Sequence, residues 1–200
     1  EAINKHKEQK EELKLFKIEY NIPLDKIVIA LGHNGFSSNN HVRMIQNLEE
    51  LPSEYKSRIC FLVHLGYGLN GSYYKELLET IESHKELNIV IINDLLEINE
   101  IAKLRVITDL MIQAPVSDAL SAAMTEVLYA GNKVIAAAWL PYGILRRNGV
   151  VYDEFETFLE LPKKIVANLE TTFHSNEVNK KAHGTEFHGS SFIRINLHRY

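Results

Sequence analysis

Two acidic residues, Asp118 and Glu126, have the spacing in this sequence that most clearly suggests chemistry. They lie eight positions apart in the stretch TDLMIQAPVSDALSAAMTEVLYAGNKVIAAA, residues 108–138. A carboxylate can accept two hydrogen bonds from neighbouring hydroxyl groups, so Glu126 could bind a ribose and Asp118 the hydroxyls of a sugar. Each residue also has an ordinary interpretation, Asp118 as a helix N-cap and Glu126 as a solvated helical residue.

The residues around this pair predict two parallel strands joined by a helix. Residues 110–112 and 133–138 are short apolar runs of the kind that form buried strands. A helix is expected over residues 119–130, capped by Ser117 or Asp118 and ended by a glycine. In parallel sheets, ligands bind beyond the carboxyl ends of the strands. The loop before this helix is therefore an expected ligand position.

The alternation of strand and helix extends from residue 26 to residue 169. Further strands are expected at residues 26–31, 58–65, 88–92 and 150–152, and helices at residues 1–20, 41–51, 72–84, 95–106 and 155–169. This order predicts an α/β fold with a doubly wound, Rossmann-like parallel sheet. The expected domain spans residues 25–170, between a linker or connecting helix at residues 1–24 and a carboxyl-terminal tail at residues 171–200.

The composition fits one globular domain. The chain has 200 residues, of which 46% are hydrophobic, and its net charge of −4 gives no electrostatic case for a nucleic-acid or membrane-surface protein. Its one cysteine, Cys60, lies in an apolar run and is expected to be a reduced core residue. No apolar run approaches the roughly 20 residues of a membrane span. The first residue is Glu rather than Met, as in a piece of a longer protein.

Three of the expected strand ends carry glycine-rich or polar loops. These loops are GHNGFSSNNH at residues 32–41, GYG at residues 66–68 and the turn at residues 115–118. A parallel sheet brings them to one edge, where backbone N–H groups and helix N-termini favour a phosphate group. No basic cluster accompanies them. This edge is therefore expected to bind a ligand with a phosphate and sugar hydroxyls.

Several other chemistries have no motif in the sequence. His33 and His41 flank the first loop and His64 lies within a strand, and each has a structural interpretation as a hydrogen-bonded residue. The histidines of residues 171–200 lack the spacing of a zinc site, so no metal site is expected. There is no G-x-S-x-G, no phosphate-binding G-x-x-x-x-G-K and no G-x-G-x-x-G. A nicotinamide dehydrogenase is therefore disfavoured.

Beyond these patterns, one segment resembles a known family. SDALSAAMTEVLYAGNKVI, with Asp118 and Glu126, resembles the E-x7-E element of GT-B glycosyltransferases. The upstream NIPLDKIVIALGHNG resembles the entry into the carboxyl-terminal, donor-binding half of these enzymes. GHNGFSSNNH and GYG look more narrowly like the bacterial transferases that add 4-acetamido-4,6-dideoxygalactose (Fuc4NAc) from a TDP-sugar to a lipid-linked carrier. The resemblance covers roughly residues 22–169.

The resemblance implies hexosyl transfer from a UDP- or TDP-sugar, with no cofactor and no obligatory metal. It implies a role in bacterial surface polysaccharide or glycolipid synthesis, in the cytoplasm or at the inner membrane. A missing amino-terminal half would bind the lipid-linked or glycan acceptor, and the chain would be inactive without it. The donor-binding residues implied are Gly32, His33, Asn34, Gly35, Ser37, Gly66, Tyr67, Gly68, Asn93, Ser117, Asp118, Ala119 and Glu126. Catalytic residues stay unassigned.

Two departures from the family pattern accompany the resemblance. The first acidic position is Asp118 rather than Glu, which shortens its reach by one methylene. GHNGFSSNNH also lacks the Arg and Lys with which many GT-B enzymes neutralise the leaving diphosphate, so backbone N–H groups or His33 would have to substitute. Two other functions stay open: an enzyme like the nucleotide-sugar 2-epimerases, and a non-catalytic α/β interaction module.

Overall fold

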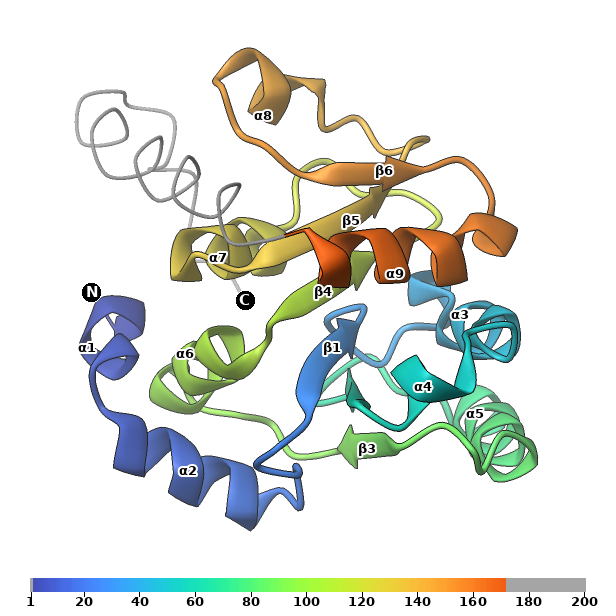
Figure 1. Cartoon of the computed structure of the whole chain (residues 1–200), viewed down its shortest axis with the longest axis horizontal. Helices are drawn as coiled ribbons and strands as arrows, with labels where there is room; N and C mark the ends of the chain where they lie inside the picture. Colours follow the sequence, from blue (N-terminus) through green and yellow to red (C-terminus); the bar gives the residue numbers. More distant parts are fainter. Residues whose placement is uncertain (1, 172–200) are drawn as a thin grey trace.

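The computed structural model describes residues 2–171, so the expectations for residues 172–200, including the tail histidines, lie outside the described residues. Six strands form one fully parallel sheet in the order β3-β2-β1-β4-β5-β6 (Figure 1). The strands are β1 (Ile27–Leu31), β2 (Ile59–His64), β3 (Ile89–Ile92), β4 (Leu110–Gln113), β5 (Lys133–Ala137) and β6 (Asp153–Phe155). The chain winds outward from β1 in one direction and from β4 in the other. This confirms the doubly wound, Rossmann-like prediction.

Helices cover both faces of this sheet (Figure 1). On one face lie α3 (His41–Leu48), α4 (Ser53–Lys56), α5 (Gly71–Ser83) and α9 (Leu161–Glu170). On the other lie α1 (Ala2–Lys7), α2 (Lys10–Glu19), α6 (Ile98–Ile107) and α7 (Ala122–Ala130). A short helix, α8 (Gly143–Arg147), and two 3-10 turns, η1 (Ser37–Asn39) and η2 (Phe158–Glu160), lie in the loops. The layered arrangement leaves the carboxyl ends of the strands free to carry a site.

Strands covered on both faces explain the continuous apolar runs of the sequence. Every residue of β2 is buried, and Cys60 within it is free and has no exposed surface, as predicted. Burial raises the pKa of the Cys60 thiol to about 11, because the thiolate would lose its hydration. The cysteine therefore acts as a small apolar core residue.

The amino-terminal residues form two helices rather than one. The helical conformation is interrupted at Glu8 and Gln9, between α1 and α2. Phe16 of α2 is only 3% exposed and belongs to the same buried cluster as Val28 of β1 and Leu104 of α6. Residues 1–24, expected to be a linker or connecting helix, thus include two helices that pack on one face of the sheet.

Three predicted boundaries differ from the structure. Helix α7 begins at Ala122 rather than residue 119, because Ser121 is its N-cap and accepts from the Met124 N–H at 3.2 Å. The last strand is Asp153–Phe155 rather than residues 150–152. The helix expected from residue 155 starts only at Leu161, with a proline in its first turn, where the missing N–H of proline has no cost.

Candidate functional site

The three loops that were predicted to converge lie together at the carboxyl edge of the sheet. The Gly35 N–H donates to the Tyr67 carbonyl at 2.7 Å, which joins the loops after β1 and β2. The Val116 N–H donates to the Ser38 carbonyl at 2.8 Å, which joins the loops after β4 and β1. We call residues 32–40, 66–69 and 113–118 the loop cluster.

Gly35 allows the loops of this cluster to approach so closely. A Cβ added at Gly35 would lie 2.9 Å from the carbonyl oxygens of both Leu65 and Tyr67. Gly32 adopts a φ of +66°, and a Cβ there would lie 2.9 Å from Asn39 Oδ1 and from His41 Nε2. The conformation of these loops therefore requires glycine at both positions, because the Cβ of any other residue would overlap atoms that have little room to move.

Asp118 lies at the end of a partly buried hydrogen-bond chain that runs through the loop cluster. Gln113, the last residue of β4, has no exposed surface, and its Nε2 donates to Asp118 Oδ2 at 3.2 Å. The Tyr142 hydroxyl donates to the same oxygen at 2.9 Å. His33 Nδ1 lies 3.3 Å from Gln113 Oε1 and donates to it. The structure thus brings His33 and Asp118, both predicted site residues, into one network.

This network also explains why Asp118 is not the N-cap of α7. Its carboxylate is committed to Gln113 and Tyr142, and the cap is supplied three residues later by Ser121. Asp118 Oδ1 accepts no hydrogen bond from any residue between 2 and 171. One oxygen is therefore held in place while the other is available to a ligand hydroxyl.

Burial sets the protonation states in the network. It lowers the pKa of His33, and the nearby Asp118 carboxylate opposes that shift. It also raises the pKa of the Tyr142 hydroxyl. Near neutral pH, His33 is then a neutral ring that donates through Nδ1 and can accept through Nε2. Tyr142 stays protonated as the donor to Asp118.

Glu126, the second predicted carboxylate, has a different environment. Arg105 Nε of α6 donates to Glu126 Oε2 at 3.0 Å, and the Arg105 side chain is only 8% exposed. Glu126 is 35% exposed, so it is neither a fully solvated residue nor a buried one. Within the described part of the chain, Asp118 and Glu126 share no hydrogen-bond partner, although both act electrostatically on His33.

The remaining predicted residues fall into two groups. Asn34 is 6% exposed and holds the first turn, since its Oδ1 accepts from the Phe36 N–H and from Asn39 Nδ2. Asn93 instead donates to the Tyr74 hydroxyl at 3.1 Å, at the end of the edge strand β3. The side chains of Tyr67, Ser37 and Ser117 are exposed on the loop cluster, and Ala119 is exposed just after it. Gly66 and Gly68 lie in the second loop of the cluster.

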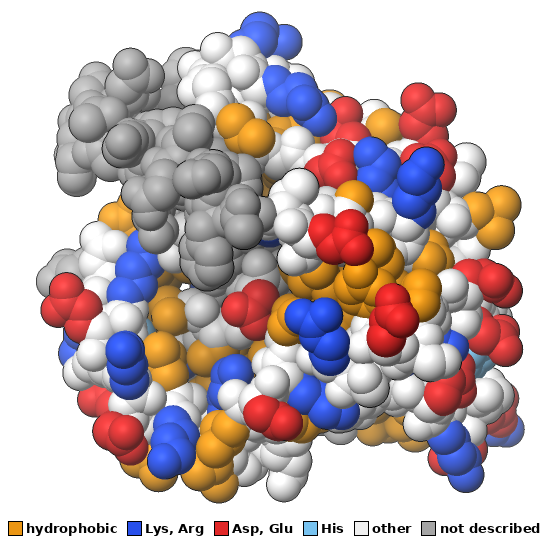
Figure 2. Space-filling view, viewed as in Figure 1, with side chains coloured by type: hydrophobic (Ala, Val, Ile, Leu, Met, Phe, Trp, Pro, Cys, Tyr) orange, Lys and Arg blue, Asp and Glu red, His pale blue; other side chains and the backbone are white. Residues whose placement is uncertain are grey.

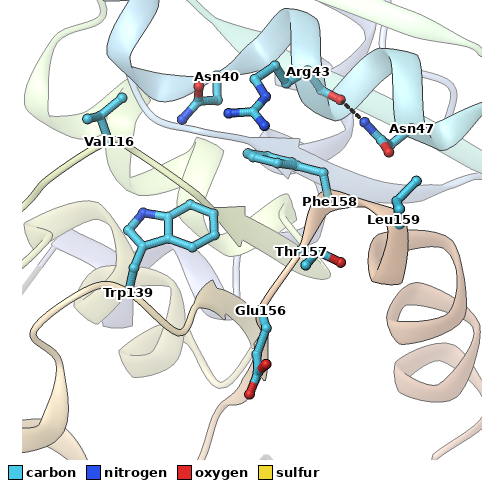
Figure 3. A pocket seen from close by; sticks show the side chains of 9 residues that line it. All are labelled: Asn40, Arg43, Asn47, Val116, Trp139, Glu156, Thr157, Phe158 and Leu159. Carbon is cyan, nitrogen blue, oxygen red and sulfur yellow. Dashed lines mark hydrogen bonds between the residues drawn. The ribbon is translucent and has the colours of Figure 1, made fainter.

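A cavity of about 470 Å³ lies at the same edge, and none of the predicted site residues lines it. Its walls come from α3 and from the loops after β4, β5 and β6, and include Arg43, Trp139 and Phe158 (Figure 3). The sequence offered one signal for it, the single tryptophan placed just after an expected strand. The sequence pattern around Arg43 indicates only a helix.

Between residues 2 and 171, no group of three or more His, Cys, Asp or Glu side chains is arranged to hold a metal ion. Over the same residues, no helix combines the length and apolar character needed to cross a bilayer.

The sequence matches no protein-family model and no curated protein. By structure, the chain is similar to a glycosyltransferase from Rickettsia africae (20% identity, TM-score 0.70) and to HepE from Anabaena, solved with UDP-glucose (17%, 0.71). It is also similar to WaaG, a glycosyltransferase involved in lipopolysaccharide biosynthesis (14%, 0.66). The matches cover 86%, 87% and 86% of this chain and 46%, 47% and 46% of those chains, respectively.

The chain therefore spans about half the length of the solved structures that it matches. At these identities the similarity establishes the fold alone: a six-stranded, all-parallel Rossmann-like unit of the kind found in about half of each of those structures.

Proposed function

We propose that this chain is the donor-binding half of a GT-B glycosyltransferase and binds a nucleoside-diphosphate sugar at the loop cluster. The observation that carries the proposal is the position of Asp118. It lies beyond the carboxyl end of β4, next to β1, where the strand order reverses and where doubly wound sheets bind their ligands. The UDP-glucose complex of the similar HepE structure supports the same class of donor.

The roles follow from the groups available in the network. Asp118 Oδ1 would accept from a hydroxyl of the sugar, and backbone N–H groups of the glycine-rich loops would face the diphosphate. Glu126 Oε1 would accept from the ribose while Oε2 stays with Arg105. Neutral His33 would accept a hydrogen bond from a hydroxyl group through Nε2. A diphosphate beside the ring would raise the pKa of His33 and convert it to a donor.

The proposal extends to the wider role of the protein. We place it in bacterial surface polysaccharide or glycolipid synthesis on the cytoplasmic side of the membrane, in line with the role of the similar WaaG. A further Rossmann-like half would supply the acceptor site, and the donor would be bound without a metal. A TDP-linked Fuc4NAc donor is the narrower version of the proposal.

Isothermal titration calorimetry on the full chain tests this function. UDP, UDP-glucose and TDP are titrated with EDTA present, and binding of a nucleotide diphosphate in EDTA is the expected result. Asp118→Asn should weaken UDP-glucose binding about tenfold, the order of one hydrogen bond to a charged group, and change UDP binding little. Glu126→Gln should weaken both.

Asp25→Asn is the matched control, because Asp25 is an exposed carboxylate at the amino end of β1. It should leave all affinities unchanged. The proposal fails if no nucleotide diphosphate binds the wild-type chain, or if Asp25→Asn weakens binding as much as Asp118→Asn does.

A further inference from the structure

The cavity beside Trp139 borders the loop cluster, sharing Asn40 and Val116 with it, but none of the residues predicted to bind the donor lines it. Helix α3 contributes Arg43 and Asn47 to one wall, and Asn40 lies there just before the helix begins, as Figure 3 shows. The loops after β4, β5 and β6 contribute Val116, Trp139 and residues 156–159. Its volume of about 470 Å³ is within the roughly 300–1,000 Å³ range of small-molecule sites.

The aromatic wall of the cavity is rigid and partly bare. Trp139 Nε1 donates to the Pro115 carbonyl at 2.8 Å, which fixes the orientation of the indole. The indole meets Phe155 edge-on at 5.6 Å and Phe158 at 5.7 Å. Even so, Trp139 is 42% exposed, so part of its indole is accessible to a ligand.

Among the described residues, Arg43 supplies a positive charge without a counterion. Its guanidinium stacks over the Phe158 ring at 4.6 Å. Within residues 2–171, no carboxylate pairs with it and no acceptor takes a hydrogen bond from its guanidinium. Glu156 also lines the cavity, but its carboxylate points away from Arg43 (Figure 3). The fork of N–H donors on Arg43 is therefore available to an anion.

The combination of these walls selects a ligand class. A guanidinium binds a carboxylate or phosphate through paired hydrogen bonds, with the ring of Phe158 keeping it flat. A fixed indole face packs against the apolar C–H face of a sugar ring, as it does against other flat apolar groups. Asn47 Oδ1 and Thr157 at the rim are suited to hydroxyl groups.

We propose that this cavity binds a saccharide that carries an anionic group, either a phosphate or a carboxylate. The site goes beyond the proposed donor site and uses none of the residues assigned to the donor. A free anion would make no use of the indole, and a neutral sugar would make no use of Arg43. Both features are used only when the ring and the charge belong to one molecule.

The single tryptophan of the chain makes the test direct, because all indole fluorescence comes from Trp139. Glucose 6-phosphate and glucuronate are titrated into the full chain while this fluorescence is recorded. Both should produce a saturable change. Glucose and inorganic phosphate should each bind at least tenfold more weakly. Arg43→Gln should weaken glucose 6-phosphate binding at least tenfold. Arg43→Lys keeps the charge but loses the fork of N–H donors, so its affinity should lie between those of the wild type and Arg43→Gln.

Arg147→Gln is the matched control, since it removes an exposed arginine from α8, outside the cavity. It should change glucose 6-phosphate affinity less than twofold. The proposal is overturned if neither anionic sugar gives a saturable change, or if Arg43→Gln binds as well as wild type. It is also overturned if inorganic phosphate, glucose or UDP binds at Trp139 as tightly as glucose 6-phosphate.

Calorimetry with UDP-glucose on the same variants separates this site from the donor site. Arg43→Gln should keep UDP-glucose affinity, and Asp118→Asn should keep glucose 6-phosphate affinity. If UDP-glucose fails to bind while glucose 6-phosphate binds through Arg43, the donor proposal fails and this one stands. The reverse pattern rejects the Trp139 site alone.

Discussion

The carboxyl edge of the sheet has two sides that are built in opposite ways. On the loop cluster, polar side chains bond mainly to one another: His33 to Gln113, Gln113 to Asp118, and Tyr142 to Asp118. In the cavity around Trp139, the guanidinium of Arg43 bonds to no described residue and the indole keeps a bare face. The first side is preorganised, whereas the second keeps its strongest binding groups uncommitted.

This difference separates two requirements of a binding site. Preorganised groups avoid the entropic cost of ordering side chains when a ligand binds. However, most of their hydrogen-bond donors and acceptors are already in use. Asp118 illustrates the balance, with Oδ2 fixed by two donors and Oδ1 open. Uncommitted groups can make more hydrogen bonds to a ligand, but the ligand must then hold them in one conformation. Selective substitutions on each side should therefore have unequal effects on stability and on binding.

The largest effect is expected at Gly35, where the loop cluster is tightest. Gly35→Ala should lower the free energy of unfolding by about 3 kcal/mol, since the new methyl group would overlap two backbone carbonyls that cannot rotate away. Gly71→Ala is the control, because a Cβ there meets nothing within 4 Å at the start of α5. Urea unfolding of both variants measures the difference. Equal effects at the two positions would show that the loop cluster is not tightly packed.

Acidification should weaken the fold through the buried histidines. His41 has no exposed surface, and burial lowers its pKa to about 4, against about 6.5 when unfolded. The unfolded chain then binds more protons between these values, so stability is complete above about pH 6.5 and falls as the pH approaches 4. The loss from His41 alone at pH 5 should be about 2 kcal/mol.

His33 and His64 also have lowered pKa values because of burial, so they add to the same trend. His41→Gln isolates the contribution of His41. Urea midpoints at pH 7.5, 6 and 5 should show a shallower pH dependence for the variant than for the wild type. Parallel pH profiles for the two proteins would contradict the assignment.

The sheet could be predicted from the sequence because its signals are local. Residues of β2 form an unbroken apolar run, as strands buried on both faces require, and the glycine-bearing loops follow such runs directly. The start of α7 was less predictable, since Ser117, Asp118 and Ser121 are all good caps. Hydrogen bonds from Gln113 and Tyr142 hold the Asp118 carboxylate, so it does not cap the helix. No pattern near residue 118 reveals that Tyr142, 24 positions away, is its partner.

The cavity could not be predicted for a related reason. Arg43, Trp139 and Phe158 come from a helix and two loops that lie far apart in the sequence. At position 43 the helical pattern indicates only an exposed face, and it does not tell which loop will cover it. The loop that lacks an Arg or Lys spans residues 32–41, and Arg43 lies two positions after it, inside the following helix.

A smaller effect is expected from the ion pair between Arg105 and Glu126. Glu126→Gln leaves the buried guanidinium of Arg105 without its counterion, so the free energy of unfolding should fall by about 1–2 kcal/mol, less than for a fully buried pair because Glu126 is one-third exposed. The control is Glu79→Gln, which removes an exposed pair with Lys75 and should cost less than about 0.5 kcal/mol.

The combination of stability and binding decides what Glu126 does. If Glu126→Gln loses stability but keeps UDP affinity, the carboxylate is only the partner of Arg105. If both fall, Glu126 serves Arg105 through Oε2 and the ligand through Oε1. A variant with neither effect would show that the ion pair does not contribute to stability and that Glu126 does not bind the nucleotide.

The smallest change in stability is expected at Arg43, on the open side of the comparison. Its contact with Phe158 is an exposed cation–π interaction, which contributes only about 0.5–1 kcal/mol, so Arg43→Gln should shift the urea midpoint slightly. Phe158 is 7% exposed and packs against Trp139 and Phe155 regardless of Arg43. A loss above about 2 kcal/mol would exceed what such a contact supplies and would show that Arg43 is structural. A small loss of stability together with a large loss of anionic-sugar binding is the result that an uncommitted binding group requires.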